Sequence, residues 1–150
     1  MLKNLVSLNF PPAPLKLARK NDQPMVWDAF RKKYLVLTPE EWVRQHLLHY
    51  LMEHLHYPQA TLATESGFKL QAQPRRSDVL VYKNSRPMLL AECKAPQVKL
   101  TQNTLDQASR YNLHYQVPYI VLTNGLSHFA AKAKNKGYEL LPAIPTYREL

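Results

Sequence analysis

Cysteine, glycine and long apolar runs are all scarce in this chain of 150 residues. Its single cysteine, Cys93, excludes an intramolecular disulfide and argues against a cysteine-ligated zinc site. No stretch approaches the roughly 18 consecutive apolar residues of a membrane helix. Prolines from Pro11 onward end the short N-terminal apolar stretch before it could form a secretory signal. We therefore expect a cytoplasmic protein that has no membrane partner.

Acidic residues are also few, so the charge balance is strongly basic. The chain has 20 Lys and Arg against 11 Asp and Glu, a net charge of +9, and a pI near 9.7. Such an excess favours a polyanionic partner, with nucleic acid ahead of an acidic membrane surface. The alternative is that the spare lysines serve solubility alone. Hydrophobic residues make up an ordinary 45%, and the length fits one domain.

Proline, by contrast, is abundant, and its distribution divides the chain. Four of the 12 prolines fall within the first 24 residues, which are also rich in lysine and arginine. We predict that residues 1–34 form an extended, basic, proline-rich arm and lead-in, and that residues 35–150 form one domain. Only the apolar run Tyr34–Leu37 reads as a short edge strand at their junction.

The elements of this domain follow from periodicity and turn residues. The sequence Thr-Pro-Glu-Glu from Thr38, followed by apolar residues every four positions, predicts a helix that ends near His56. Three strands are expected next, over residues 60–70, 78–82 and 88–94, then a helix over 102–114, a buried strand over 119–123 and a hairpin of 128–133 and 138–141. Because strands joined through a helix pair in parallel, the order predicts an α/β fold with a mixed sheet flanked by helices.

Side chains alternate between the two faces of the predicted strand 88–94, and this alternation predicts which face each candidate catalytic residue occupies. Glu92 and Lys94 point to one face, whereas Cys93 points to the other, where it is expected to be a buried small hydrophobe. Asp78 begins the preceding strand and brings a second carboxylate to the same sheet edge. Two carboxylates and an ammonium suit a divalent metal, such as Mg²⁺, and a hydrolytic water. The alternative for Glu92 and Lys94 alone is a solvated salt bridge at a strand end.

Together, Asp78, Glu92-Cys93-Lys94 and the helical segment 107–111 (QASRY) resemble the PD-(D/E)xK nuclease superfamily. More narrowly, the chain resembles the N-terminal nuclease domain of type I restriction enzyme R subunits. The similarity runs from about Leu35 to Pro145 and includes TPEEWVRQHLL, RRSDVLVY, MLLAECKAP, DQASRYN and YIVLTNG in the order of the family. Ser77 precedes Asp78, where the name of the superfamily has proline.

This resemblance implies a restriction-endonuclease-like core and a metal-dependent nuclease that hydrolyses phosphodiester bonds, in DNA before RNA. It implies that Asp78 and Glu92 bind the metal, that the Cys93 backbone carbonyl completes its coordination, and that Lys94 is the catalytic lysine. Mg²⁺ is the expected cofactor, with Mn²⁺ as a substitute. The chain would act alone, as a homo-oligomer or with separately encoded subunits. The alternative is a non-catalytic nucleic-acid-binding or complex-docking module of the same fold.

Further residues near these motifs are candidates for supporting roles. Gln107 and Tyr111 share a helix face and match a Gln-x-x-x-Tyr signature of the family, which implies that they support the site. Glu65, on the strand before Asp78, is a candidate third acid. Glu41 in the first helix is the other candidate, although a capping-box role already explains its carboxylate.

Basic residues surround the predicted acids in the sequence. Those expected to contact nucleic acid are Lys69, Arg75, Arg76 and Lys99. As a group they favour contact with a phosphate backbone, which positions a strand without reading its bases. The alternative for each residue taken singly is a solvated basic face.

Overall fold

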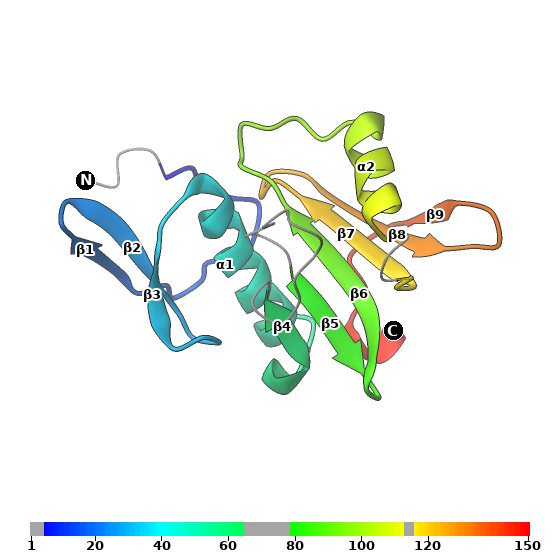
Figure 1. The fold of residues 1–150 in the computed structure, drawn as a ribbon, viewed down its shortest axis with the longest axis horizontal. Coiled ribbons are helices and arrows are strands. Elements are labelled where there is room, and N and C mark those ends of the chain that lie inside the picture. The colour runs from blue at the N-terminus through cyan, green and yellow to red at the C-terminus, as the bar shows by residue number, and fades with distance from the viewer. Residues whose placement is uncertain (1–4, 65–78, 113–115) are drawn as a thin grey trace.

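The computed structural model describes residues 5–64, 79–112 and 116–150, with the backbone alone at Thr64, Tyr111 and Asn112 (Figure 1). In chain order the elements are β1 (Leu17–Lys20), β2 (Gln23–Asp28), β3 (Lys33–Val36), α1 (Pro39–Glu53), the 3-10 helix η1 (Gln59–Thr61), β4 (Leu62–Thr64), β5 (Val79–Lys83), β6 (Arg86–Cys93), α2 (Gln102–Asn112), β7 (Tyr119–Thr123), β8 (His128–Ala133), β9 (Tyr138–Leu141) and the 3-10 helix η3 (Tyr147–Glu149). Among the described residues, no helix has the length and apolar character needed to cross a membrane.

The larger sheet has the strand order β4-β5-β6-β7-β8-β9. Strands β6 and β7, which are joined through α2, pair in parallel, and every other neighbouring pair is antiparallel. The predicted α/β class with a mixed sheet is confirmed, and so is the order of helix, three strands, helix, strand and hairpin. The predicted strand 60–70 is described only as β4, because residues 65–70 lie outside the described ranges.

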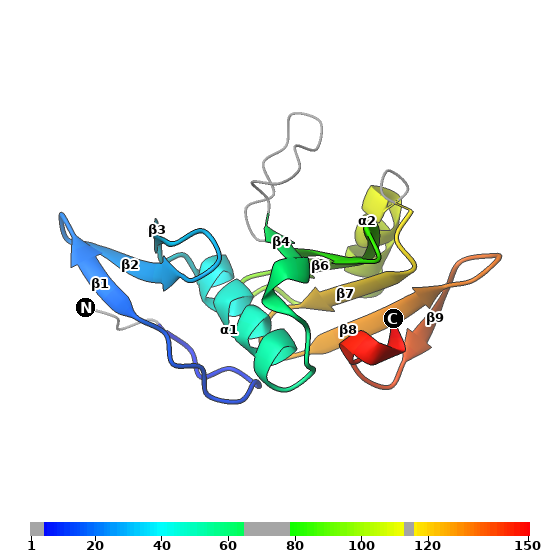
Figure 2. The same cartoon turned by 90° about the horizontal axis from the view of Figure 1, so that it is seen from below.

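Each face of the larger sheet has its own apolar contacts. The α1 side chains Val43, Leu47 and Leu51 are fully buried and belong to the same cluster as alternate residues of β5, β6 and β7, among them Ala91 and Val121. Leu80 and Leu90, on the other face, pack with Val117 in a separate cluster. Helix α2 packs against β7, and Figure 2 shows the two α-helices on different sides of the sheet. This division decides which side chains of β6 enter the α1 core and which face away from it.

Helix α1 begins as its sequence predicts, but its first turn uses Glu41 differently. The Thr38 Oγ1 accepts a hydrogen bond from the Glu41 N–H at 3.0 Å, and Pro39 takes the first turn. The reciprocal capping bond expected from Glu41 does not form, because the Thr38 N–H donates to the Val36 carbonyl at 3.1 Å. The capping-box explanation of the Glu41 carboxylate is therefore wrong.

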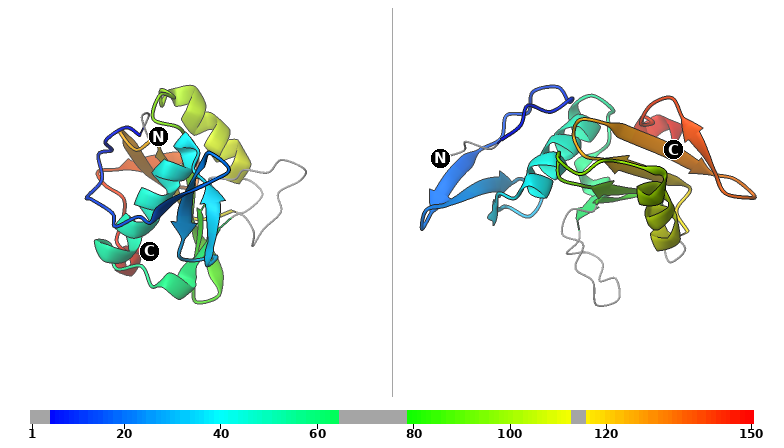
Figure 3. Two further views of the ribbon diagram at one scale, coloured as in Figure 1. Left: turned by 90° about the vertical axis from the view of Figure 1, so that its left-hand side faces the viewer. Right: turned by 90° about the horizontal axis from the view of Figure 1, so that it is seen from above.

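The N-terminal region holds a second, three-stranded sheet in the order β1-β2-β3. The predicted extended arm over residues 1–34 is therefore wrong for residues 17–28, which form β1 and β2. Asn21 and Asp22 both have positive φ angles, 51° and 61°, and these allow a tight hairpin turn without glycine. Figure 3, like Figure 2, places this sheet at one end of an elongated molecule and the β8–β9 hairpin at the other.

A buried ionic cluster joins the three-stranded sheet to α1. The guanidinium of Arg44, a fully buried residue, donates from Nη2 to Asp28 Oδ2 at 2.6 Å and from Nε to Glu41 Oε2 at 2.7 Å. Gln45 Nε2 donates to the same two carboxylate oxygens, at 3.2 Å each. Because Asp28 ends β2 and the other three residues lie on α1, the cluster fixes one element against the other.

The cluster keeps its charges although they are buried. Burial alone would raise the pKa of Asp28, but the hydrogen bond and charge of Arg44, helped by the backbone N–H groups of Phe30 and Arg31, lower that pKa below its ordinary value of 3.8. Burial would likewise lower the pKa of Arg44, yet the charge and hydrogen bond of Glu41, then those of Asp28, raise it. The folded protein therefore favours the ionised pair.

We predict that Asp28→Asn lowers the free energy of unfolding by about 3 kcal/mol at neutral pH, because it removes one partner of a buried charge pair. The pKa of Asp28 is lower in the folded state, so its contribution is present above pH 3.8 and is lost as the pH falls through the folded value. Urea denaturation at a series of pH values measures the difference between the two proteins.

The matched control for this measurement is Asp22→Asn. Asp22 is exposed in the β1–β2 turn, and asparagine also accepts a positive φ there. We expect its stability to follow that of the wild-type protein at every pH. A constant difference between wild type and Asp28→Asn from neutral pH to below pH 3.8 would contradict the ionised cluster.

Candidate active site

Glu92 and Lys94 meet at the C-terminal end of β6. The Lys94 Nζ lies 3.1 Å from Glu92 Oε1, and the exposed fraction is 7% for the Glu92 side chain and 30% for the Lys94 side chain. Both therefore lie on one face, as the alternation predicts. The alternative of a solvated salt bridge does not describe this pair, because the carboxylate is buried and the lysine side chain is only partly exposed.

Cys93, between them, belongs to the opposite face. It is 3% exposed and packs in the core that α1 forms with the sheet, so the prediction of a buried small hydrophobe is confirmed. The Lys94 N–H donates to the Thr123 carbonyl of β7 at 2.8 Å. Since the N–H and C=O of a trans peptide point in opposite directions, the Cys93 carbonyl is directed away from β7, to the side of β6 on which β5 lies.

The predicted second acid, Asp78, directly precedes strand β5 in the sequence. Val79 opens β5 and is in register with Ala91, the residue before Glu92. Several predicted residues lie outside the described ranges, namely Glu65, Lys69, Arg75, Arg76 and Asp78. Their predicted roles in metal and nucleic-acid binding therefore stay predictions.

The predicted supporting residues Gln107 and Tyr111 lie on α2, and the predicted nucleic-acid contact Lys99 lies in the loop before it. Gln107 is exposed on α2, next to Ala108, which is 2% exposed. Its predicted supporting role stays a prediction. Tyr111 lies in the last turn of α2, where only the backbone is described. Lys99 is exposed in the loop that leads from β6 to α2.

One residue that supports this region was not among the predicted site residues. Asn124 is 6% exposed, and its Nδ2 donates to the Val98 carbonyl at 2.8 Å. Its Oδ1 accepts from the backbone N–H groups of Leu126 and Ser127, at 2.9 and 2.7 Å. Asn124 thus ties the loop that follows Lys94 to the end of β7. The sequence signal for it was present in Asn-Gly, which predicts only the end of a strand.

The following glycine is required by close packing. Gly125 has a φ of 85°, and a Cβ at this position would lie 2.7 Å from a methyl carbon of Leu8 and 3.1 Å from one of Val43. Its N–H donates to Thr123 Oγ1 at 2.9 Å. The N-terminal segment and α1 therefore approach the end of β7 as closely as a residue without a side chain allows.

Two oxygen donors of the described residues lie at the end of β6. The Glu92 carboxylate and the Cys93 carbonyl are both hard ligands of the kind that Mg²⁺ takes. Within residues 5–64, 79–112 and 116–150 no group of three or more His, Cys, Asp and Glu side chains is arranged to hold a metal ion. The predicted metal site needs Asp78 as well, and this residue lies outside those ranges.

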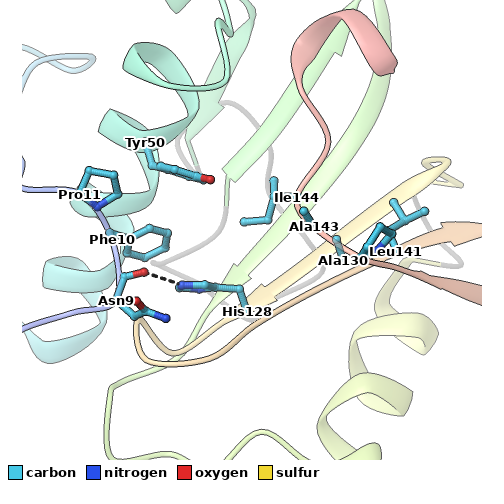
Figure 4. A pocket seen from close by; sticks show the side chains of 10 residues that line it. Asn9, Phe10, Pro11, Tyr50, His128, Ala130, Leu141, Ala143 and Ile144 are labelled. Atoms are coloured by element: carbon cyan, nitrogen blue, oxygen red, sulfur yellow. Dashed lines mark hydrogen bonds between the residues drawn. The ribbon is translucent and has the colours of Figure 1, made fainter.

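A cavity of about 540 Å³ lies elsewhere, between the N-terminal segment, α1 and the β8–β9 hairpin (Figure 4). Phe10 and His128 line it with ring centroids 4.3 Å apart, and Tyr50 and Ile144 face them. His128 Nε2 lies 2.8 Å from the Asn9 carbonyl oxygen. Because no carboxylate is among the described residues that line this cavity, these residues do not offer the chemistry of the pair at the end of β6.

Helix α1 and the larger sheet lie within a match to a known protein family. A family model described as type I restriction enzyme R protein N terminus matches residues 39–145. The match begins at the first residue of α1 and includes every strand of the larger sheet, with Glu92 and Lys94, but it leaves out the three-stranded sheet. No curated protein and no solved structure matches the chain.

We predict that Asn124→Ala lowers the free energy of unfolding by about 1–3 kcal/mol, because it leaves the Val98 carbonyl and two backbone N–H groups without their partner. Thermal or urea denaturation measures the loss. The control is Asn135→Ala, in the exposed turn of the β8–β9 hairpin, where we expect a change below about 0.5 kcal/mol. Equal stability of the two variants would show that Asn124 does not anchor the loop.

Proposed function

The chain belongs to the family of type I restriction enzyme R protein N termini, and from this premise we propose that it is a metal-dependent nuclease that hydrolyses phosphodiester bonds in DNA. The family implies a restriction-related nuclease domain. One observation carries the finer proposal: the buried Glu92 carboxylate lies 3.1 Å from the ammonium of Lys94 at the end of a strand within the matched residues.

The burial of Glu92 is costly unless the carboxylate has a function or a compensating charge. Lys94 supplies that charge, and its side chain still reaches solvent. A substrate phosphate can approach the ammonium from that open side without displacing the core. This arrangement supports a role in chemistry over a purely structural ion pair.

The residues present fit a divalent metal by their donor atoms. Asp78, Glu92 and the Cys93 carbonyl would hold it, because all three offer the oxygen ligands that Mg²⁺ prefers, and Mn²⁺ would substitute. When bound, the metal would lower the pKa of the attacking water and neutralise charge that develops on the phosphate. The structure supports this set through Glu92, and through the direction of the Cys93 carbonyl towards the side of β5.

Lys94 would act on the substrate side of the site. Its ammonium has three donors, and one is directed to Glu92 Oε1. The other donors would hold the attacking water or a phosphate oxygen and stabilise negative charge in the transition state. Glu92 holds the ammonium in place and would also bind the metal, so each residue limits the position of the other.

The basic surface would bind the DNA backbone around this site. Lys99, exposed in the loop that follows Lys94, is one proposed phosphate contact. The other proposed contacts are Lys69, Arg75 and Arg76, which precede Asp78 in the sequence. We expect the protein to work in the cytoplasm, alone, as a homo-oligomer or with separately encoded subunits.

We predict that the purified protein cleaves plasmid DNA with Mg²⁺ or Mn²⁺ and that EDTA abolishes cleavage. Glu92→Gln and Lys94→Ala are each expected to lower the rate about 100-fold or more, because they remove a metal ligand and a transition-state donor. Gel electrophoresis of supercoiled, nicked and linear plasmid measures the rates.

Lys136→Ala is the control, because Lys136 is exposed in the β8–β9 turn and should leave cleavage unchanged. Equal cleavage by the wild-type protein and the Lys94→Ala variant would contradict the proposed site. Salt-dependent DNA binding without cleavage under either metal would instead favour a non-catalytic module of the same fold.

A further inference from the structure

The three-stranded sheet has one buried and one open face. Val26 and Asp28 of β2 are both 0% exposed, and Asp28 binds Arg44 of α1, so this face is directed to α1. Trp27 lies between them and points to the other face. Trp27 is in register with Tyr34 of β3, and cross-strand partners share a face.

Aromatic and apolar side chains cover the open face. Tyr34 is 45% exposed, Val36 is 42% exposed, and Trp27 and Met25 are half-buried. The rings of Trp27 and Tyr34 have centroids 5.1 Å apart and planes inclined at 65°, an edge-to-face pair. Each ring therefore restrains the other, so the exposed aromatic surface is held in one arrangement before any partner binds.

Positive charge borders this aromatic pair. Ala18 pairs with Met25, so alternation places Lys20 on the same face as Trp27, and Lys16 precedes β1 in the same alternation. Both lysines are exposed. Lys32, also exposed, lies just before β3, whereas Lys33 is in register with Asp28 and so belongs to the face directed to α1.

The acids of this sheet offset little of that charge. Asp28 is buried and already bound to Arg44, and Asp22 lies in the β1–β2 turn, beside Lys20 but at the opposite end of the hairpin from Lys16 and Trp27. The open face therefore joins two aromatic rings with lysines. This is the combination that stacks unpaired bases and neutralises their phosphates. A duplex hides its base faces, and an acidic peptide has no need of the rings.

We propose that the open face of β1–β3 binds a single-stranded segment of nucleic acid, with bases stacked on Tyr34 and Trp27 and phosphates on Lys16 and Lys20. The inference rests on the proposed nuclease function, since it adds a surface for the same class of substrate. The sheet lies outside the residues that the family model matches, so family membership assigns it no role. Figure 1 shows it beyond α1, away from the larger sheet.

The test is fluorescence anisotropy with the full chain in EDTA, so that binding is measured without cleavage. The probes are a labelled oligothymidylate of about 15 nucleotides and a duplex of equal length. Tyr34→Ala is expected to weaken oligothymidylate binding about fivefold or more and to change duplex binding less than about twofold. Tyr34→Phe, which keeps the ring, should bind as the wild type does.

Phe129→Ala is the matched control, because Phe129 is an aromatic residue 40% exposed on β8, a strand of the larger sheet. Circular dichroism checks that both alanine variants stay folded, as expected for exposed positions. Unchanged oligothymidylate binding by Tyr34→Ala would overturn the proposal, and so would equal weakening by Phe129→Ala. Polyglutamate that competes as well as unlabelled oligothymidylate would overturn it in favour of an acidic protein partner.

The outcome is independent of the cleavage assay. Loss of stacking in Tyr34→Ala together with inactive wild-type protein would contradict the nuclease and support this surface. Plasmid cleavage by the wild-type protein, together with equal oligothymidylate binding by the wild-type protein and Tyr34→Ala, would support the nuclease and contradict this surface.

Discussion

The placement of the N-terminal sheet depends on the buried guanidinium of Arg44. Arg44 bonds Asp28 from β2 and Glu41 from its own helix, and α1 also packs its apolar side chains against the larger sheet. One helix therefore carries an ionic contact to the small sheet and an apolar contact to the large one. A buried pair of this kind adds little net stability over apolar packing, but it tolerates little change of position, because a displaced charge would be left without its partner. That constraint also decides which face of β1–β3 is covered and which stays open.

Strand β6, like α1, makes a different kind of contact on each of its two sides, because neighbouring residues point to opposite faces of the sheet. Cys93 packs in the α1 core, while Glu92 and Lys94 face the other side. The core thereby fixes the backbone from which the ion pair projects, and Asn124 fixes the loop that follows it through the Val98 carbonyl. A site built at the end of a central strand gains rigidity from the pairing on both sides of that strand, which a site on a free loop would lack.

Apolar runs and turn residues predicted most of the strands and helices, whereas features that depend on long-range contacts were not predicted. The strand 119–123 and the hairpin 128–133 and 138–141 have the predicted bounds, because apolar runs there end at Asn-Gly and Asn-Lys-Gly turns. The β1–β2 hairpin escaped prediction because its turn lacks glycine and its strands carry Pro24 and basic residues. Alternation placed Glu92 and Lys94 on one face. It could not reveal the partner of Arg44 on β2, because Asp28 and Arg44 come together only in the folded chain.

Several of the acids that contribute to the net charge of +9 are buried, whereas many lysines are exposed. Asp28, Glu41 and Glu92 are all buried, and each is bound to a cation, Arg44 or Lys94. These carboxylates offset charge inside the molecule, where they hold elements or a site in place. Exposed lysines such as Lys16, Lys20 and Lys99 lie outside these pairs. Salt screens exposed charges far more than buried pairs, so added salt should weaken the attraction for a polyanion while leaving the ionic cluster intact. Folding and the proposed attraction of nucleic acid would thus depend on separate sets of charges.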